Sequence, residues 1–280
     1  MINMTIRTPL RPLDMLLIVL LALLAGCRPA GGNATPAAPE AEAEPVTLTV
    51  FAAASLTDAF NEIGAAFSAA NPGVTVAFNF AGSNQLAAQI GEGAPADVFA
   101  SANRKQMDAA VDTGRIAADA PRVFVTNRLV IVTPAGGDVA ELSGLAAPGT
   151  LVVLAAAEVP AGQYALEFLD KAATDPTLGA GFKAAALGNV VSYEQNVRAV
   201  LNKVALGEAD AGIVYASDAA GAEGVTIIDI PDALNVLAQY PIAPLSDGPN
   251  ATLAAAFVTY VLGPEGQATL ARYGFGMGEE

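Results

Sequence analysis

The chain has 280 residues, and 53% of them are hydrophobic, which is enough to form the core of one large domain or of two lobes. Its 28 acidic and 13 basic side chains leave a formal net charge of −15, so its surface repels nucleic acid and anionic lipid headgroups at long range. The chain has no histidine and a single cysteine, which excludes zinc sites, Ser-His-Asp triads and thiol catalysis. Any anion that it binds must therefore be held by short-range, directional donors rather than by a basic patch.

The N-terminal segment has the pattern of an exported lipoprotein. Arg7 and Arg11 precede an apolar run over residues 15–24, and small residues then lead to Cys27. The run is shorter than a membrane-spanning helix needs, so the pattern predicts a lipoprotein signal peptide over residues 1–26 and lipidation of Cys27. An uncleaved signal anchor is the alternative, and both interpretations place the protein outside the cytoplasmic membrane.

The next segment, residues 27–45, is rich in Ala, Pro, Gly and Glu and has no apolar periodicity. This composition is typical of a solvated tether, so the folded part is expected to begin near Val46. We therefore expect a protein that is anchored by its lipid to the outer face of the cytoplasmic membrane, on the periplasmic or extracellular side.

The first strand of the folded part leads directly into a helix. An apolar strand pattern stops at Ser55, and Ser55 with Asp58 has the spacing of a capping box. Apolar residues then follow at helical spacing, at Phe60, Ile63 and Phe67. A helix that starts at a strand end directs unpaired N–H groups and the positive end of its dipole at the crevice where open α/β sheets bind ligands.

The same strand-to-helix pattern recurs three times. In the first case, a strand over residues 74–80 precedes a helix that starts after Ser83. In the second, a strand over 151–157 precedes helical spacing over 159–169. In the third, Asn196 precedes a helix, and the strand after that helix ends at Tyr215. Each junction offers small residues, hydroxyls or backbone amides rather than charges. The alternation of strands and helices predicts an α/β protein with parallel layers and helices on both faces.

Seven motifs occur in order between Val46 and Phe275, and together they resemble a known family. They are FAAASLT, FAGSNQLAAQI, GAPADVFASAN, VPAG, EQNVRAVL, GIVYASDA and GPEGQATLARYGF. The chain is similar to the molybdate-binding component of ABC importers, the molybdate/tungstate branch of the type II periplasmic-binding-protein family.

The resemblance implies a two-lobe fold in which each lobe is a mostly parallel sheet flanked by helices. Laid on this sequence, it places lobe I at residues 46–127 and 240–280 and lobe II at residues 128–239. The segments 128–134 and 240–245 would be the two crossing strands of a hinge.

The resemblance also implies particular ligand-binding residues. Hydroxyl or backbone donors to the oxyanion would come from both lobes, at Ser55, Ser83, Ala161, Val197 and Tyr215. Two departures from the family's pattern bear on the pocket size: alanines occupy residues 155–157, where relatives often carry more polar residues, and Gly82 stands where many have serine.

The implied function is the capture of molybdate or tungstate in the interlobe cleft through neutral hydrogen-bond donors. A monomer without a cofactor, and without direct protein ligands to molybdenum, would deliver the ion to an ABC transporter permease with its ATPase subunit. Binding of another small oxyanion, such as sulfate or phosphate, is the alternative. A serine hydrolase that uses Ser55 with a lysine base is disfavoured because none of the four lysines lies near a serine motif. A structural or sensory lipoprotein is the remaining interpretation.

Taken without the resemblance, the same residues have simpler interpretations. Ser55 alone indicates a helix cap, Ser83 a turn residue and Tyr215 a half-buried strand tyrosine. The nomination of Ala161 and Val197 depends on the resemblance and on their position at helix starts.

Overall fold

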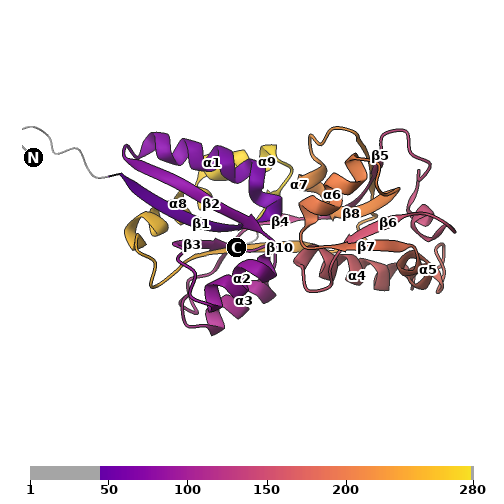
Figure 1. The fold of residues 1–280 in the computed structure, drawn as a ribbon, viewed down its shortest axis with the longest axis horizontal. Coiled ribbons are helices and arrows are strands. Elements are labelled where there is room, and N and C mark those ends of the chain that lie inside the picture. The colour runs from indigo at the N-terminus through magenta and orange to yellow at the C-terminus, as the bar shows by residue number, and fades with distance from the viewer. Residues whose placement is uncertain (1–44, 279–280) are drawn as a thin grey trace, which may run out of the picture. The chain divides into compact units, whose positions relative to one another are not determined.

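The computed structural model describes residues 45–278 (Figure 1). The predicted signal peptide, the lipidation site Cys27 and the tether up to residue 44 lie outside the described residues. Within residues 45–278, no helix has the length and apolar character that crossing a membrane requires.

A six-stranded sheet, which we call the first sheet, has the order β11-β4-β10-β3-β1-β2. Its strands are β1 Val46–Ala53, β2 Val74–Ala81, β3 Val98–Ala100, β4 Arg122–Asn127, β10 Ala238–Pro244 and β11 Gly276–Met277. The helices that pack on it are α1 Thr57–Ala70, α2 Ser83–Gly91, α3 Arg104–Asp112, α8 Ala251–Leu262 and α9 Pro264–Arg272. Figure 1 shows α1 and α9 on one face of this sheet and α2 and α3 on the other. We call the first sheet and its helices the first lobe.

The second sheet has five strands in the order β7-β6-β8-β5-β9. Its strands are β5 Leu129–Pro134, β6 Val152–Ala155, β7 Val190–Glu194, β8 Ala211–Tyr215 and β9 Val225–Asp229. The helices of this second lobe are α4 Pro160–Ala172, α5 Phe182–Gly188, α6 Val197–Ala205 and α7 Ala216–Ala219. Two 3-10 turns complete the elements, η1 Ala54–Leu56 after β1 and η2 Leu142–Ala146 before β6.

Both sheets are mixed, which corrects the expectation of mostly parallel sheets. In the first sheet β1 pairs in parallel with β2 and β3, whereas β10 is antiparallel to β3 and β4. In the second sheet β6 is parallel to β7 and β8, whereas β5 is antiparallel to β8 and β9. The antiparallel strands β4, β5 and β10 are those by which the chain leaves the first sheet and returns to it. Apolar periodicity does not report strand direction, so the sequence pattern does not distinguish these strands from parallel ones.

The core of the first lobe forms around the apolar face of α1. Phe60, Ile63 and Phe67 are buried, which confirms the helical face that their spacing predicts. Phe257 of α8 packs edge-on against Phe60 and Phe67, with ring centroids 6.1 and 5.3 Å apart. The C-terminal helices therefore pack on the lobe in which the described chain begins.

Candidate functional site

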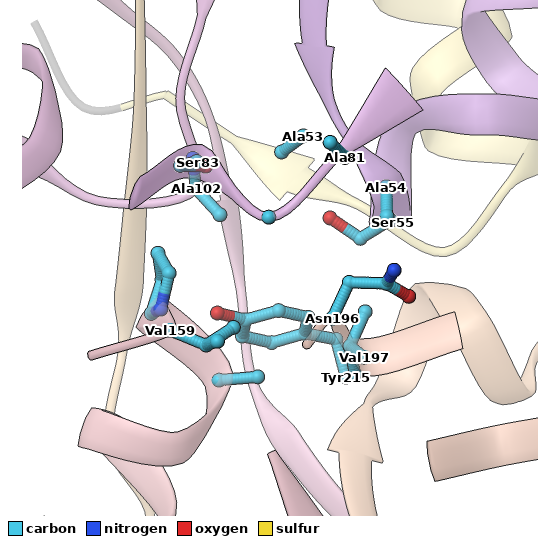
Figure 2. A pocket seen from close by; sticks show the side chains of 13 residues that line it. Ala53, Ala54, Ser55, Ala81, Ser83, Ala102, Val159, Asn196, Val197 and Tyr215 are labelled. Carbon is cyan, nitrogen blue, oxygen red and sulfur yellow. The ribbon is translucent and has the colours of Figure 1, made fainter. Parts of the chain in front are cut away.

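A small cavity lies where the ends of strands from both sheets meet the starts of helices (Figure 2). In this ligand-free structure its volume is about 10 Å³, room for about one water molecule, so a larger anion enters only with the surrounding lobes slightly further apart than they are here. None of the residues that line it carries a charge; they are Ala53, Ala54, Ser55, Ala81, Gly82, Ser83, Ala102, Val159, Pro160, Ala161, Asn196, Val197 and Tyr215. The structure thus brings together all five residues nominated from the sequence.

Ser55 lies in the tight turn η1 that joins β1 to α1, and its predicted role as a helix cap is wrong. The cap position of α1 is Leu56, and no side chain caps this helix. The Ser55 hydroxyl instead lies 2.9 Å from the hydroxyl of Tyr240, a residue of β10 that is distant in sequence. Because the turn η1 intervenes between strand and helix, Ser55 faces the cavity rather than the first turn of α1 (Figure 2).

Ser83 is the first residue of α2, which begins directly after β2. Its hydroxyl oxygen accepts a hydrogen bond of 3.0 Å from the backbone N–H of Ala102. Since one lone pair of the oxygen is used in this way, the hydroxyl proton is available to an acceptor in the cavity. The hydrogen bond from the Ala102 amide therefore orients the Ser83 hydroxyl so that it can donate its proton to a ligand.

The start of α4 brings the Ala161 amide to the cavity. Pro160 occupies the first turn, where a missing N–H costs nothing, and the amides of the first turn have no acceptor within the helix. Gly162 is required here because a Cβ at this position would lie 2.1 Å from the carbonyl oxygen of Ala156 and 2.4 Å from that of Ala155. The absence of this side chain lets the helix start sit directly against the end of β6.

The start of α6 supplies the second amide. Asn196 caps the helix, as predicted, because its side-chain oxygen accepts from the backbone N–H of Ala199 at 3.0 Å. This bond satisfies an amide further along the first turn and leaves the N–H of Val197 available for the cavity. The positive end of the helix dipole lies at the same place and favours an anion there.

Tyr215, the last residue of β8, has a buried hydroxyl for which the described residues offer no hydrogen-bond partner. The side chain is only 1% exposed and lines the cavity, and its ring packs edge-on against Tyr240 with centroids 5.7 Å apart. Burial, and then the neighbouring Tyr240, raise the pKa of Tyr215 well above 10.0, so the phenol stays protonated and can donate. An unsatisfied buried donor is costly, so its persistence here points to a ligand.

One cation, Arg198, lies next to the cavity-lining Val197 but is engaged by two carboxylates. It forms ion pairs with Asp58 of α1 and with Asp218 of α7, the latter at 2.9 Å, and so bridges the two lobes. Burial raises the pKa of Asp218 from 3.8 to about 7, and the Arg198 guanidinium acts in the opposite direction. The guanidinium nearest the cavity is thus already paired and offers no free positive charge to a ligand.

Neutral contacts also join the two lobes around the cavity. Gln85 donates to the side-chain oxygen of Gln195 at 3.2 Å, and Asn103 donates to that of Gln163 at 3.1 Å. At Gly82 the lobes approach so closely that a Cβ would lie 2.6 Å from the carbonyl oxygen of Gln195. Glycine at this position, a departure from the family's pattern, therefore permits the observed approach of the lobes.

The residues that line the cavity thus include three with hydroxyls and two at helix starts, they come from two lobes, and no lysine or arginine is among them. Convergent uncharged donors of this kind suit an acceptor-rich anion. The sequence analysis did not single out Tyr240 or Arg198 for the site. Their contacts join residues that are 185 and 140 positions apart, so no local pattern signals them.

Comparisons with known proteins show to which family this chain belongs. The family model described as bacterial extracellular solute-binding protein matches residues 48–276. The molybdate-binding protein ModA of Mycobacterium tuberculosis is 42% identical over 90% of this chain and 94% of its own length. A Bacillus subtilis protein named putative ABC transporter substrate-binding lipoprotein YvgL is 32% identical over 92% and 96% of the two chains.

A solved structure, the periplasmic molybdate-binding protein of Azotobacter vinelandii, has the same fold. It matches with a TM-score of 0.72 at 20% identity and covers 83% of this chain and all of that one (100%). The α/β fold, with two sheets flanked by helices, is thus that of a periplasmic binding protein, as the resemblance implies, although the sheets are mixed. The chain belongs to the family of bacterial extracellular solute-binding proteins.

Proposed function

We propose that this protein captures molybdate or tungstate in the cavity between its lobes and delivers it to an ABC transporter permease with its ATPase subunit. The relatives named as molybdate-binding and as ABC transporter substrate-binding proteins support the ligand and the partner. The proposed donors are the hydroxyls of Ser55, Ser83 and Tyr215 and the amides of Ala161 and Val197. Molybdenum would be held only through its oxygens, and the protein would carry out no catalysis.

The observation that carries the proposal is that these five uncharged residues, far apart in sequence, all line one cavity. A hydrogen bond to a charged acceptor contributes roughly 1.5–3 kcal/mol, so several together can hold a dianion without a cationic side chain. The ligand would contact both lobes and so favour their closure. Because the donors are fixed by strand ends and helix starts, a smaller ion such as sulfate would be held by longer bonds, and cavity size would select the larger ion.

The remaining parts of the proposal concern place and assembly. Cys27 would carry the lipid that anchors a monomer to the outer face of the cytoplasmic membrane. The lobes would comprise residues 46–127 with 240–280 and residues 128–239, with the segments 128–134 and 240–245 as the hinge. The change of sheet between β4 and β5, and again between β9 and β10, supports this division.

Calorimetric titration of the protein with molybdate, tungstate, sulfate and phosphate tests the ligand. We expect molybdate and tungstate to bind most tightly, and Ser55→Ala to weaken binding by at least about tenfold. Ser143→Ala is the matched control, since that exposed hydroxyl bonds to Glu141 away from the cavity. Tighter binding of sulfate or phosphate would favour the alternative ligand, and no binding of any oxyanion would contradict the proposal.

A further inference from the structure

Behind the cavity, a chain of buried polar groups leads from Asn127 through Tyr240 to Ser55. Asn127 is the last residue of β4, and its side-chain nitrogen lies 3.4 Å from the hydroxyl of Tyr240. The Tyr240 hydroxyl in turn lies 2.9 Å from that of Ser55. Tyr240 is 0% exposed and is not among the residues that line the cavity.

The direction of this chain follows from the orientation of the Asn127 amide. Its oxygen accepts a hydrogen bond of 3.0 Å from the backbone N–H of Arg128. The nitrogen therefore faces the other way, where it donates to Ser217 at 2.7 Å and to Tyr240. An amide nitrogen has no lone pair to offer, so Asn127 cannot accept the phenolic proton of Tyr240 through this atom.

The Tyr240 proton then has one acceptor among the described residues, the hydroxyl oxygen of Ser55. A fully buried donor left without an acceptor is costly, so Tyr240 donates and Ser55 accepts. The Ser55 proton is thereby freed for an acceptor in the cavity. The Ala102 amide does the same for Ser83, but with a backbone group instead of a side chain.

We propose that Tyr240 is a positioning residue that holds Ser55 as a hydrogen-bond donor to the bound oxyanion. The inference rests on the proposed function, because it concerns how that site binds its ligand. Without the Tyr240 phenol, the Ser55 hydroxyl would lose its fixed direction and could also present a lone pair, which repels an anion. Tyr240 thus affects affinity through Ser55 and not by contact with the ligand.

A double-mutant cycle in molybdate binding tests this coupling. In the parent background, Tyr240→Phe is expected to weaken molybdate binding by about tenfold, the loss of most of one charge-assisted hydrogen bond. In the Ser55→Ala background, the same substitution is expected to change affinity by less than about twofold. A role in packing alone would give the same loss in both backgrounds, so equal losses would overturn the proposal, as would an unchanged affinity of Tyr240→Phe.

Two further variants test whether the loss of molybdate affinity is specific to the hydrogen bond between Tyr240 and Ser55. Tyr273→Phe is the control for loss of a phenol in the same lobe, because that hydroxyl bonds to Glu62 at 3.0 Å outside the cavity. Asn127→Leu is the second test should Tyr240→Phe fold poorly. It removes the hydrogen bond that the Tyr240 oxygen accepts from Asn127 and so leaves that oxygen free to accept the Ser55 proton, and a loss of affinity confined to the Ser55-containing background is again expected. If the parent protein binds none of the oxyanions, the proposed function is contradicted. If the parent binds molybdate but the effects of the Tyr240 and Ser55 substitutions on affinity are additive, only the role of Tyr240 is contradicted.

Discussion

Tyr215→Phe is expected to stabilise the ligand-free protein and at the same time to weaken anion binding. The Tyr215 hydroxyl is buried without a partner in the described residues, and such a group costs about 1–3 kcal/mol. Where the ligand-free lobes stay together, its removal should therefore raise the free energy of unfolding by up to about 1 kcal/mol, or the melting temperature by up to about 2–4 °C for a protein of this size. In the complex the same hydroxyl would donate to the anion, so the variant should lose about 1.5–3 kcal/mol of binding free energy, a factor of about 10 to 150 in affinity.

Thermal unfolding with and without molybdate measures both effects in one experiment. At a molybdate concentration about 1,000 times the parent's dissociation constant, binding stabilises the folded state by about 4.1 kcal/mol. A variant that binds about 100-fold more weakly would gain only about 1.4 kcal/mol at the same concentration. The ligand-induced rise in melting temperature should therefore shrink by about 5–10 °C, while the ligand-free melting temperature rises.

The control is Tyr164→Phe, which removes a neighbouring phenol whose ring packs edge-on against Tyr215 with centroids 6.4 Å apart. Tyr164 does not line the cavity, so its loss should leave molybdate affinity unchanged. The reasoning is refuted by a Tyr215→Phe protein that is less stable than the parent without ligand. It is equally refuted by one that binds molybdate as tightly as the parent does.

Three other substitutions test the contacts around the cavity. Gly82→Ala should lower molybdate affinity in calorimetry without removing any donor, because its Cβ would lie 2.6 Å from a backbone oxygen of the second lobe and keep the lobes apart. Arg198→Gln should weaken binding by up to about fivefold, since it breaks the partly exposed pair with Asp58 across the lobes and leaves the buried Asp218 without its cation. Arg272→Gln, which breaks an exposed pair within the first lobe, is its control and should bind as the parent does. Asp218→Asn should flatten the pH dependence of the free energy of unfolding, because the pKa of Asp218 in the folded state is raised to about 7. In urea unfolding, the parent should lose stability relative to the variant as pH rises from about 4 to about 7, by at most about 1.4 kcal/mol per pH unit. A stability difference that stays constant over this pH range would contradict the prediction.

Local features of the fold could be predicted from the sequence because their causes are local. The Asn196 cap acts on an amide three residues away, and the apolar face of α1 repeats within two turns. The positions of the candidate donors could be nominated because short motifs that contain them resemble those of a known family, although their roles as ligand contacts remain predictions.

Features that depend on distant residues could not be predicted in this way. Ser55 has the spacing of a helix cap, yet its hydroxyl bonds to Tyr240, which a turn and a returning strand bring to it. The directions of β5 and β10 depend on where the chain crosses between the sheets, and an apolar run has no signal for direction. The burial of Asp218, and hence its raised pKa, likewise depends on the packing of α7 against its neighbours.

The uncharged site has a consequence for how binding and closure are coupled. With the lobes apart, hydroxyls and helix-start amides can bond to water, so an open cleft carries little penalty. With the lobes together, the Tyr215 donor is buried without a partner, so closure around an empty cavity is penalised by about 1–3 kcal/mol for this group alone. An anion of the right size supplies the missing acceptor and removes the penalty. A basic residue in the cavity would give more affinity but would also hold anions of any size, whereas fixed neutral donors make closure depend on an ion that reaches all of them.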